Sequence, residues 1–220
     1  MNRGPFIFLG IFLIVATSWT FVLFETNQWV GNLSAVLDED LGKYVPGKTV
    51  GAAAHGKEVY QELGCIACHT QQVRVASGMD IARGWGERQS VARDYINEER
   101  SLIGNIRIGP DLSNVGSRQL DRNWYLLHFY NPQINSQGTN MPPYPFLYEV
   151  REVVGEASAN ALDLPEEFFP GKGLEVIPTR KAESLASYML SLKVDYDLEE
   201  APKSNETMAE ELAVALEIAQ

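Results

Sequence analysis

Cysteine and histidine are scarce in this sequence, with two cysteines and three histidines among 220 residues. Positive charge is also in short supply, because 18 lysines and arginines face 29 aspartates and glutamates, and the formal net charge is −11. Nucleic-acid phosphates would repel such a chain, so nucleic acid is excluded as a partner, whereas a basic protein would be attracted to an acidic face. The hydrophobic content of 45% is enough for the core of one ordinary domain.

Charge is absent from the first apolar run, which extends from Pro5 to Phe24. About 20 helical residues span roughly 30 Å, the thickness of the hydrocarbon core of a bilayer. A cleaved signal peptide is the alternative, but its apolar core would be only about 7–15 residues long and would end at a small-residue site. Here the apolar residues continue beyond Ala16-Thr17-Ser18. The run therefore predicts a retained transmembrane helix.

The charges that flank this run predict its orientation. Arg3 precedes it, and an acidic group that includes Glu25 and Asp38 follows it. Positive charge favours the cytoplasmic side, so the bulk of the chain is expected outside the cytoplasm. Trp19 and Trp29 suit the outer interface, where aromatic rings are favoured. We expect a single-pass protein of a bacterial inner (cytoplasmic) membrane with its domain on the periplasmic side.

Changes of composition along the chain predict four regions. Residues 1–29 form the anchor, residues 30–54 are a linker, and residues 55–195 hold the aromatic and apolar content of a globular domain. Residues 196–220 are strongly acidic and are expected to be a solvated tail. A peripheral helix from Met208 to Ile218 is the alternative for this tail.

Apolar spacing predicts an all-α domain with long loops. A first helix is expected from His55 to Leu63 and should end at Gly64. A second is expected from Asn123 to Tyr130, and a third should begin after Thr179, whose hydroxyl is positioned to cap it. No segment shows a convincing period of two, so no strand is expected.

The two cysteines and one histidine fall together in Cys65-Ile66-Ala67-Cys68-His69, the C-x-x-C-H pattern of covalent haem c attachment. Two thiols one helical turn apart can both reach the vinyl groups of a porphyrin, and the next histidine can bind the iron. A thioredoxin-like pair would require a βαβ context that is missing here. A zinc site would require further cysteine or histidine ligands nearby. We therefore expect one covalent haem c, which is attached outside the cytoplasm.

The second axial ligand of the iron, opposite His69, has several candidates. Met141 lies in an irregular loop braced by prolines, which can bring a thioether to the iron, and His/Met ligation suits a carrier of high reduction potential. Met79 is too close to His69 in sequence, and Met189 is expected to be a core residue on the last helix. His128 is the main alternative to Met141. We expect His69 and Met141 to bind the iron.

Further residues are candidates for haem contacts. A histidine ligand usually donates its other ring N–H to a carbonyl. The rigid turn at Pro110 could offer that carbonyl to His69, and Leu112 would then pack on the ring. The haem propionates need hydrogen-bond donors, and the candidates are Arg74, Arg107 and Arg118.

Taken together, these features resemble the mono-haem subunit (subunit II, the FixO/CcoO family) of cbb(3)-type cytochrome c oxidases. The stretches that carry the resemblance are GKEVYQELGCIACHTQQVR (56–74), IGPDLSNVGSR (108–118), WYLLHFYNP (124–132) and NMPPYPFL (140–147). The single anchor and the long insertion between His69 and Gly109 match as well. The chain departs from the family at Gln72 and Val75, near which the family has methionine and proline, and in its acidic tail.

The resemblance implies a class I-like cytochrome c domain that transfers electrons and is not an enzyme on its own. Its partners would be membrane lipid, a large haem–copper catalytic subunit, and another cytochrome c subunit or a soluble cytochrome c as electron donor. Two alternatives remain open: the haem c subunit of a nitric oxide reductase, and a free-standing anchored cytochrome that acts as a carrier or sensor.

The insertion from Gln71 to Ile108 is not required for haem binding alone. Aromatic side chains such as Trp85 and Tyr95 lie among mixed charges in it, and such anchors are typical of interface centres. We expect the insertion either to dock against the large subunit or to wrap the core of its own domain.

Overall fold

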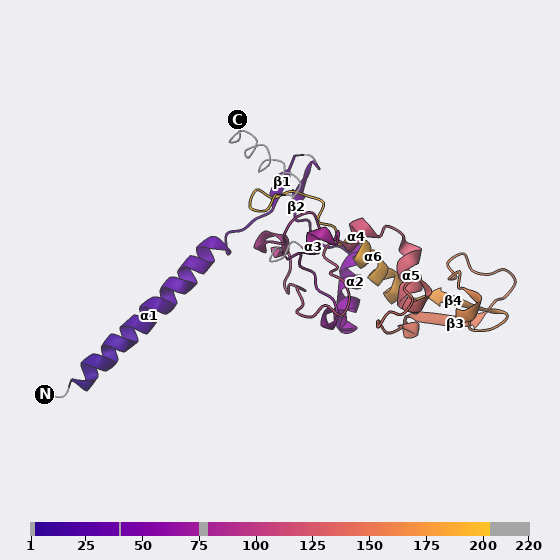
Figure 1. Ribbon diagram of the computed structural model, residues 1–220, viewed down its shortest axis with the longest axis horizontal. Coiled ribbons are helices and arrows are strands. Elements are labelled where there is room, and N and C mark those ends of the chain that lie inside the picture. The colour runs from indigo at the N-terminus through magenta and orange to yellow at the C-terminus, as the bar shows by residue number, and fades with distance from the viewer. Residues whose placement is uncertain (1–2, 40, 75–78, 203–220) are drawn as a thin grey trace. The chain divides into compact units, whose positions relative to one another are not determined.

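The computed structural model describes residues 3–39, 41–74 and 79–202 (Figure 1). Val75 and the segment from Met208 to Ile218 lie outside these described residues. The chain divides into two compact units, which are described separately. One consists of Met1–Gly47 with Val91–Glu99, and the other of Lys48–Ser90 with Arg100–Gln220.

The first unit contains the long helix α1 (Gly4–Trp29) and a small hairpin. None of the residues of α1 is buried, and the helix is long and apolar enough to cross a membrane. The hairpin pairs β1 (Val36–Asp38) with β2 (Lys43–Val45) antiparallel, inside the segment where we expected a linker. The returning segment 91–99 is tied to this part of the chain, because the Asn97 amide donates to the Pro46 carbonyl at 2.7 Å.

The second unit is built on the crossing of α2 (Gly51–Glu62) and α6 (Arg180–Ser191). The two backbones approach so closely at Gly56 that a Cβ there would lie 1.8 Å from the Ser184 carbonyl oxygen. The rings of Tyr60 and Tyr188 meet edge to face beside the crossing, with centroids 5.5 Å apart. Helix α5 (Arg122–Tyr130) packs against α6 and completes a three-helix core.

The ends of these helices show which local signals were informative. Helix α2 begins before His55, and the chain leaves it at Gly64 with a left-handed φ of 70°. Helix α5 is capped by Asp121, whose carboxylate accepts from the Asn123 N–H at 2.8 Å. Thr179 does stand at the N-cap of α6, but its hydroxyl donates to the Leu147 carbonyl instead of capping the helix. The predicted capping interaction is therefore wrong.

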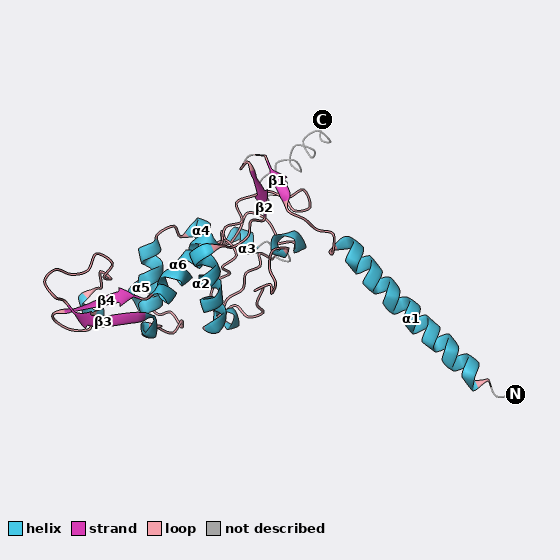
Figure 2. Ribbon diagram, turned by 180° about the vertical axis from the view of Figure 1, so that it is seen from behind, coloured by secondary structure: helices cyan, strands magenta, loops and turns pink. Residues whose placement is uncertain are grey.

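Two short helices and several single turns occupy the long loops between these helices (Figure 2). The short helices are α3 (Met79–Ala82) and α4 (Val115–Arg118). The 3₁₀ turns of the second unit are Cys65–Ala67, Pro132–Ile134, Pro145–Leu147 and Glu166–Phe168.

A second hairpin, which the sequence did not predict, pairs β3 (Tyr148–Glu152) with β4 (Leu174–Pro178). Strand β3 buries only Tyr148, whereas β4 buries four consecutive residues, so neither strand has the alternation that reveals a strand in a sequence. The expectation of no strand is therefore wrong, but both sheets are small, the described chain is mainly helical, and the predicted all-α class with long loops is confirmed. Packing also extends past residue 195, where we expected the tail to begin, because Tyr196 and Leu198 are buried.

Candidate functional site

The C-x-x-C-H segment follows α2 as a tight 3₁₀ turn. Its backbone is closed by hydrogen bonds from the N–H groups of Cys68 and His69 to the Cys65 carbonyl, at 3.1 and 3.0 Å. Neither cysteine is part of a disulfide. Burial raises the pKa of the Cys65 thiol to about 11, so this group remains protonated at neutral pH.

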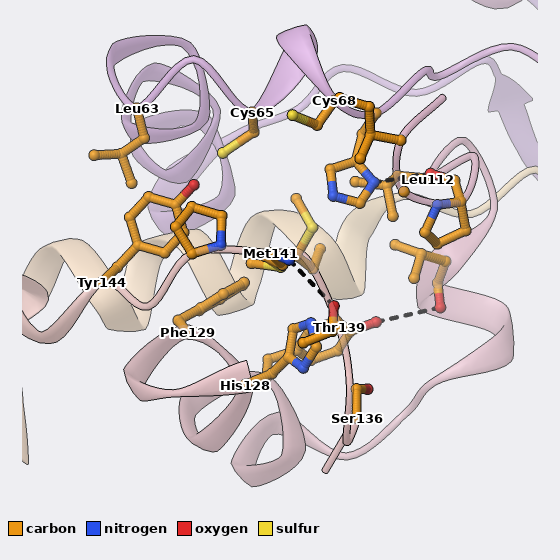
Figure 3. Close-up of a pocket in the computed structure, with 18 of the residues that line it drawn as sticks. Leu63, Cys65, Cys68, Leu112, His128, Phe129, Ser136, Thr139, Met141 and Tyr144 are labelled. Atoms are coloured by element: carbon orange, nitrogen blue, oxygen red, sulfur yellow. Dashed lines mark hydrogen bonds between the residues drawn. The ribbon is translucent and has the colours of Figure 1, made fainter. Parts of the chain in front are cut away.

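The two cysteines face a cavity of about 580 Å³. Figure 3 shows Cys65 and Cys68 on one wall, His128 and Ser136 on the opposite wall, and Met141 between them. This volume lies within the range of roughly 300–1,000 Å³ that is usual for ligand and cofactor sites. The apolar part of the lining includes Leu63, Ile108, Leu112, Val115, Phe129 and Leu185. The cavity is therefore large enough and apolar enough for a largely apolar cofactor.

His69 is oriented by the turn at Pro110. Its Nδ1 lies 2.8 Å from the Pro110 carbonyl oxygen, 41 residues further along the chain. A carbonyl only accepts, so Nδ1 carries the proton and Nε2 keeps its lone pair. Burial lowers the pKa of His69, although the bond to Pro110 opposes this shift. His69 is therefore a neutral imidazole with one nitrogen available to a metal.

Gly109 permits this turn to approach the imidazole. A Cβ at this position would lie 2.2 Å from Cε1 of His69. The Gly109 N–H also donates to the Cys68 carbonyl at 3.0 Å. Any larger residue at 109 would displace the ring or the turn, so the position of the His69 imidazole depends on residue 109 being glycine.

Three candidate axial donors line the cavity: Met141, Met189 and His128. Met141 is half-buried in its loop, where its N–H donates to the Thr139 hydroxyl at 3.2 Å. Met189 lies in the buried core on α6. Met79 does not line the cavity, and nearly half of its surface is exposed.

His128 is held by two contacts on its own side of the cavity. Its ring stacks on Trp124 with centroids 4.5 Å apart and planes at 15°. Its Nδ1 lies 2.7 Å from Oδ1 of Asn135, whose amide nitrogen donates to the Trp124 carbonyl at 3.0 Å. Nδ1 is therefore the donor, and burial lowers the pKa of this histidine. These contacts are those of a packed histidine, although Nε2 remains a base.

None of the three arginines expected to contact the propionates lines the cavity. Arg74 is exposed. Arg107 pairs with Asp80, and Arg118 donates to the backbone carbonyl of Asp111.

Polar groups that the sequence analysis missed do line the cavity, namely Ser136, Thr139 and Asn140. The polar run Asn-Ser-Gln-Gly-Thr-Asn directly before Met141 could have indicated this wall. The hydroxyl of Tyr60, another lining residue, is buried and has no hydrogen-bond partner among the described residues. Free thiols, a neutral imidazole, a thioether and apolar walls together form a donor set and a cavity that fit haem c.

Comparison with known protein families gives a match. A protein-family model described as "Cytochrome C oxidase, mono-heme subunit/FixO" matches residues 45–166. A search of curated proteins finds no match. The matched region includes the two cysteines, His69, the Pro110 turn and Met141, and it covers more than half of the chain. The chain therefore belongs to the family of mono-haem cytochrome c oxidase subunits, FixO.

Proposed function

We propose that this chain is the membrane-anchored c-type cytochrome subunit that passes electrons to the haem–copper subunit of a cbb(3)-type oxidase. As a member of a mono-haem family it carries one haem. The observation that carries the proposal is the cavity in which both thiols, the His69 imidazole and the Met141 thioether come together. The electron donor would be another cytochrome c subunit or a soluble cytochrome c.

The two cysteines, His69 and Met141 each have a separate role in this proposal. Cys65 and Cys68 would hold the haem covalently through its vinyl groups. His69 would offer Nε2 to the iron, while the Pro110 carbonyl holds its other nitrogen. Met141 would offer its thioether sulfur as a second ligand, which favours ferrous iron. When bound, the haem supplies one-electron ferric–ferrous chemistry, and the apolar lining limits water and thereby tunes the potential.

Helix α1 would anchor this centre to the respiratory membrane, which is supported by its length and apolar composition. Arg3 before the helix and the acidic residues after it support a periplasmic location for the haem-binding unit. Oxygen is reduced in the large subunit, so this chain acts as an electron-transfer subunit and not as the catalyst.

Purification of the native complex from membranes tests the proposal. Haem should remain on a polypeptide of about 24.5 kDa after denaturing electrophoresis, and Cys65→Ala together with Cys68→Ala should abolish this staining. A large multi-span subunit should co-purify with copper. A large subunit without copper would instead indicate a nitric oxide reductase, and the absence of any large subunit a free-standing cytochrome.

A further inference from the structure

Asp111 is fully buried beside the Pro110 turn, with 0% of its surface exposed. One carboxylate oxygen accepts from the Thr70 hydroxyl at 2.6 Å and from the Gln72 N–H at 2.8 Å. The other accepts from the N–H and the hydroxyl of Ser113. Both oxygens are therefore fully engaged, and the carboxylate is fixed in one orientation.

These bonds join two segments that together determine the orientation of His69. Thr70 and Gln72 directly follow His69, while Asp111 directly follows Pro110, whose carbonyl holds the imidazole. Backbone bonds flank this connection, because the Leu112 N–H donates to the Thr70 carbonyl at 2.8 Å. Asp111 thus fixes the segment that carries the imidazole to the turn that orients it.

The insertion supplies the counter-charge for this buried carboxylate. Arg107, near the end of the insertion, places Nη2 3.6 Å from Asp111 Oδ2 and donates from Nε to the Thr70 hydroxyl at 2.7 Å. The Nη1 and Nη2 atoms of Arg107 donate to the Asp80 carboxylate at 2.7 and 2.8 Å. A buried carboxylate is tolerated only when it is paired and hydrogen-bonded. Arg107 and Thr70 meet this requirement at Asp111.

We propose that Asp111 is a positioning residue for the axial ligand His69, and that Arg107 of the insertion maintains it in this role. The inference rests on the proposed haem site. By fixing the Pro110 carbonyl against Nδ1, Asp111 determines how strongly the imidazole donates to iron. A weaker bond at Nδ1 makes the imidazole a weaker ligand, which disfavours ferric iron.

Asp80 provides a matched control. It is a buried carboxylate that pairs with the same arginine, and it accepts from the Arg74 N–H at 2.7 Å. No hydrogen bond or ion pair described for Asp80 reaches the turn 108–113. Asp80→Asn therefore removes the same charge from the same network without loosening the contact between Pro110 and His69.

The experiment compares Asp111→Asn with Asp80→Asn in the purified holo-complex. The first readout is the reduction potential of the haem c. The second is the iron–histidine stretching frequency, measured by resonance Raman on ferrous protein that also carries Met141→Ala. Asp111→Asn should lower this frequency and raise the potential. Asp80→Asn should leave the frequency unchanged, whatever its electrostatic effect on the potential.

A second pair of variants covers the case in which Asp111→Asn does not fold. Thr70→Val is nearly isosteric and removes the hydroxyl that connects Arg107 with Asp111, whereas Thr70→Ser keeps that hydroxyl. The valine variant should shift the frequency downward and the serine variant should not. The inference would be overturned if Asp111→Asn and Asp80→Asn had equal frequencies and Thr70→Val and Thr70→Ser did too. If Asp111→Asn cannot be purified, equal frequencies in the two Thr70 variants would overturn it. Wild-type protein without covalent haem would instead overturn the proposed function.

Discussion

At the scale of single residues, the three candidate axial donors that line the cavity differ in how freely each side chain could move to meet an iron atom. Met189 is fixed in the core on α6. His128 is held by its stack on Trp124 and its hydrogen bond to Asn135. Met141 lies in a loop without regular structure, and its main-chain contact is to a neighbouring threonine (Figure 3). We therefore retain Met141 as the proposed ligand.

Met141→Ala should leave the haem attached, because the two thioethers are untouched. The oxidised spectrum should lose its weak far-red sulfur–iron band, and the reduction potential should fall, because a thioether favours ferrous iron. Optical spectroscopy combined with a redox titration measures both changes.

The matched control is Met189→Leu, a swap that roughly conserves volume. It should cost less than about 1.5 kcal/mol of unfolding free energy and leave the band in place. Loss of the band in the Met189 variant alone would reverse the assignment. If neither variant changes the spectrum, His128 is the ligand to test.

At the scale of elements, the β3–β4 hairpin depends on a carboxylate that both strands share. Glu175 on β4 accepts from Arg151 Nε of β3 at 2.8 Å and from the N–H and hydroxyl of Ser158 at 2.7 and 2.8 Å. The Ser158 N–H, with help from Arg151, lowers the pKa of Glu175 from 4.5 to about 2. The stabilisation is therefore fully present above pH 4.5 and is lost as the pH falls toward 2.

Pepsin digestion across this pH range tests the hairpin. Cleavage in the loop between β3 and β4 should increase in the wild type as the pH falls from 4.5 to 2, because protonated Glu175 gives up its bonds. In Glu175→Gln the loop should already be sensitive at the upper end of the range. A wild-type loop whose cleavage follows only the pH dependence of pepsin itself would contradict this role.

Helix α1 (Gly4–Trp29) is the proposed membrane anchor. The native protein should remain in the membrane pellet after washing with salt and alkaline carbonate, because about 20 apolar residues span the bilayer core. Mass spectrometry of the purified chain should find residues 5–24 still present. A chain that begins after Phe24 would instead identify α1 as a cleaved signal peptide. As a control, replacing residues 1–24 with a cleavable signal sequence should release the protein into the periplasm.

At the scale of the whole molecule, several described residues of the insertion from Gln71 to Ile108 pack within the second unit. Trp85 is half-buried between two arginines, with Arg83 and Arg107 carbons 5.0 and 5.3 Å from its ring centroid. Leu102 is part of the hydrophobic core. These contacts favour the core-wrapping role over docking for Trp85. Tyr95 belongs to the other unit, in the segment 91–99.

Two exposed isoleucines near the end of the insertion are better candidates for a partner contact. Ile106 and Ile108 expose 58% and 64% of their surface, and Ile108 also lines the haem cavity. An electron partner must approach the cofactor closely, so an apolar surface beside the cavity is where a tight interface is expected.

Ile106→Lys should yield a holo-cytochrome that inserts normally but no longer co-purifies with the large subunit, because Ile106 is exposed, does not line the cavity, and its new charge would be buried at the interface without a partner. Val154→Lys is the matched control, since Val154 is 90% exposed and does not line the cavity. Trp85→Ala should instead destabilise the haem-binding unit. Full assembly of the Ile106→Lys variant would remove this surface from the interface.

What the sequence determined by itself is local or compositional. Cys65, Cys68 and His69 lie within one short segment of the chain, so their spacing alone indicates haem attachment. The anchor follows from length and the absence of charge, and the helices follow from apolar periodicity, which short elements with uneven burial, such as β3 and β4, do not display.

Only the tertiary structure decided which distant groups meet. Arg107 is a plausible propionate donor in the sequence, but folding brings it to Asp80 and close to Asp111, and the Thr179 hydroxyl bonds Leu147 instead of its own helix. A long or polar side chain has several possible partners, and the packing of segments far apart in the chain selects among them. That packing buries Asp111, and a buried carboxylate requires a positive charge nearby. The residues next to Asp111 in the sequence do not reveal this requirement.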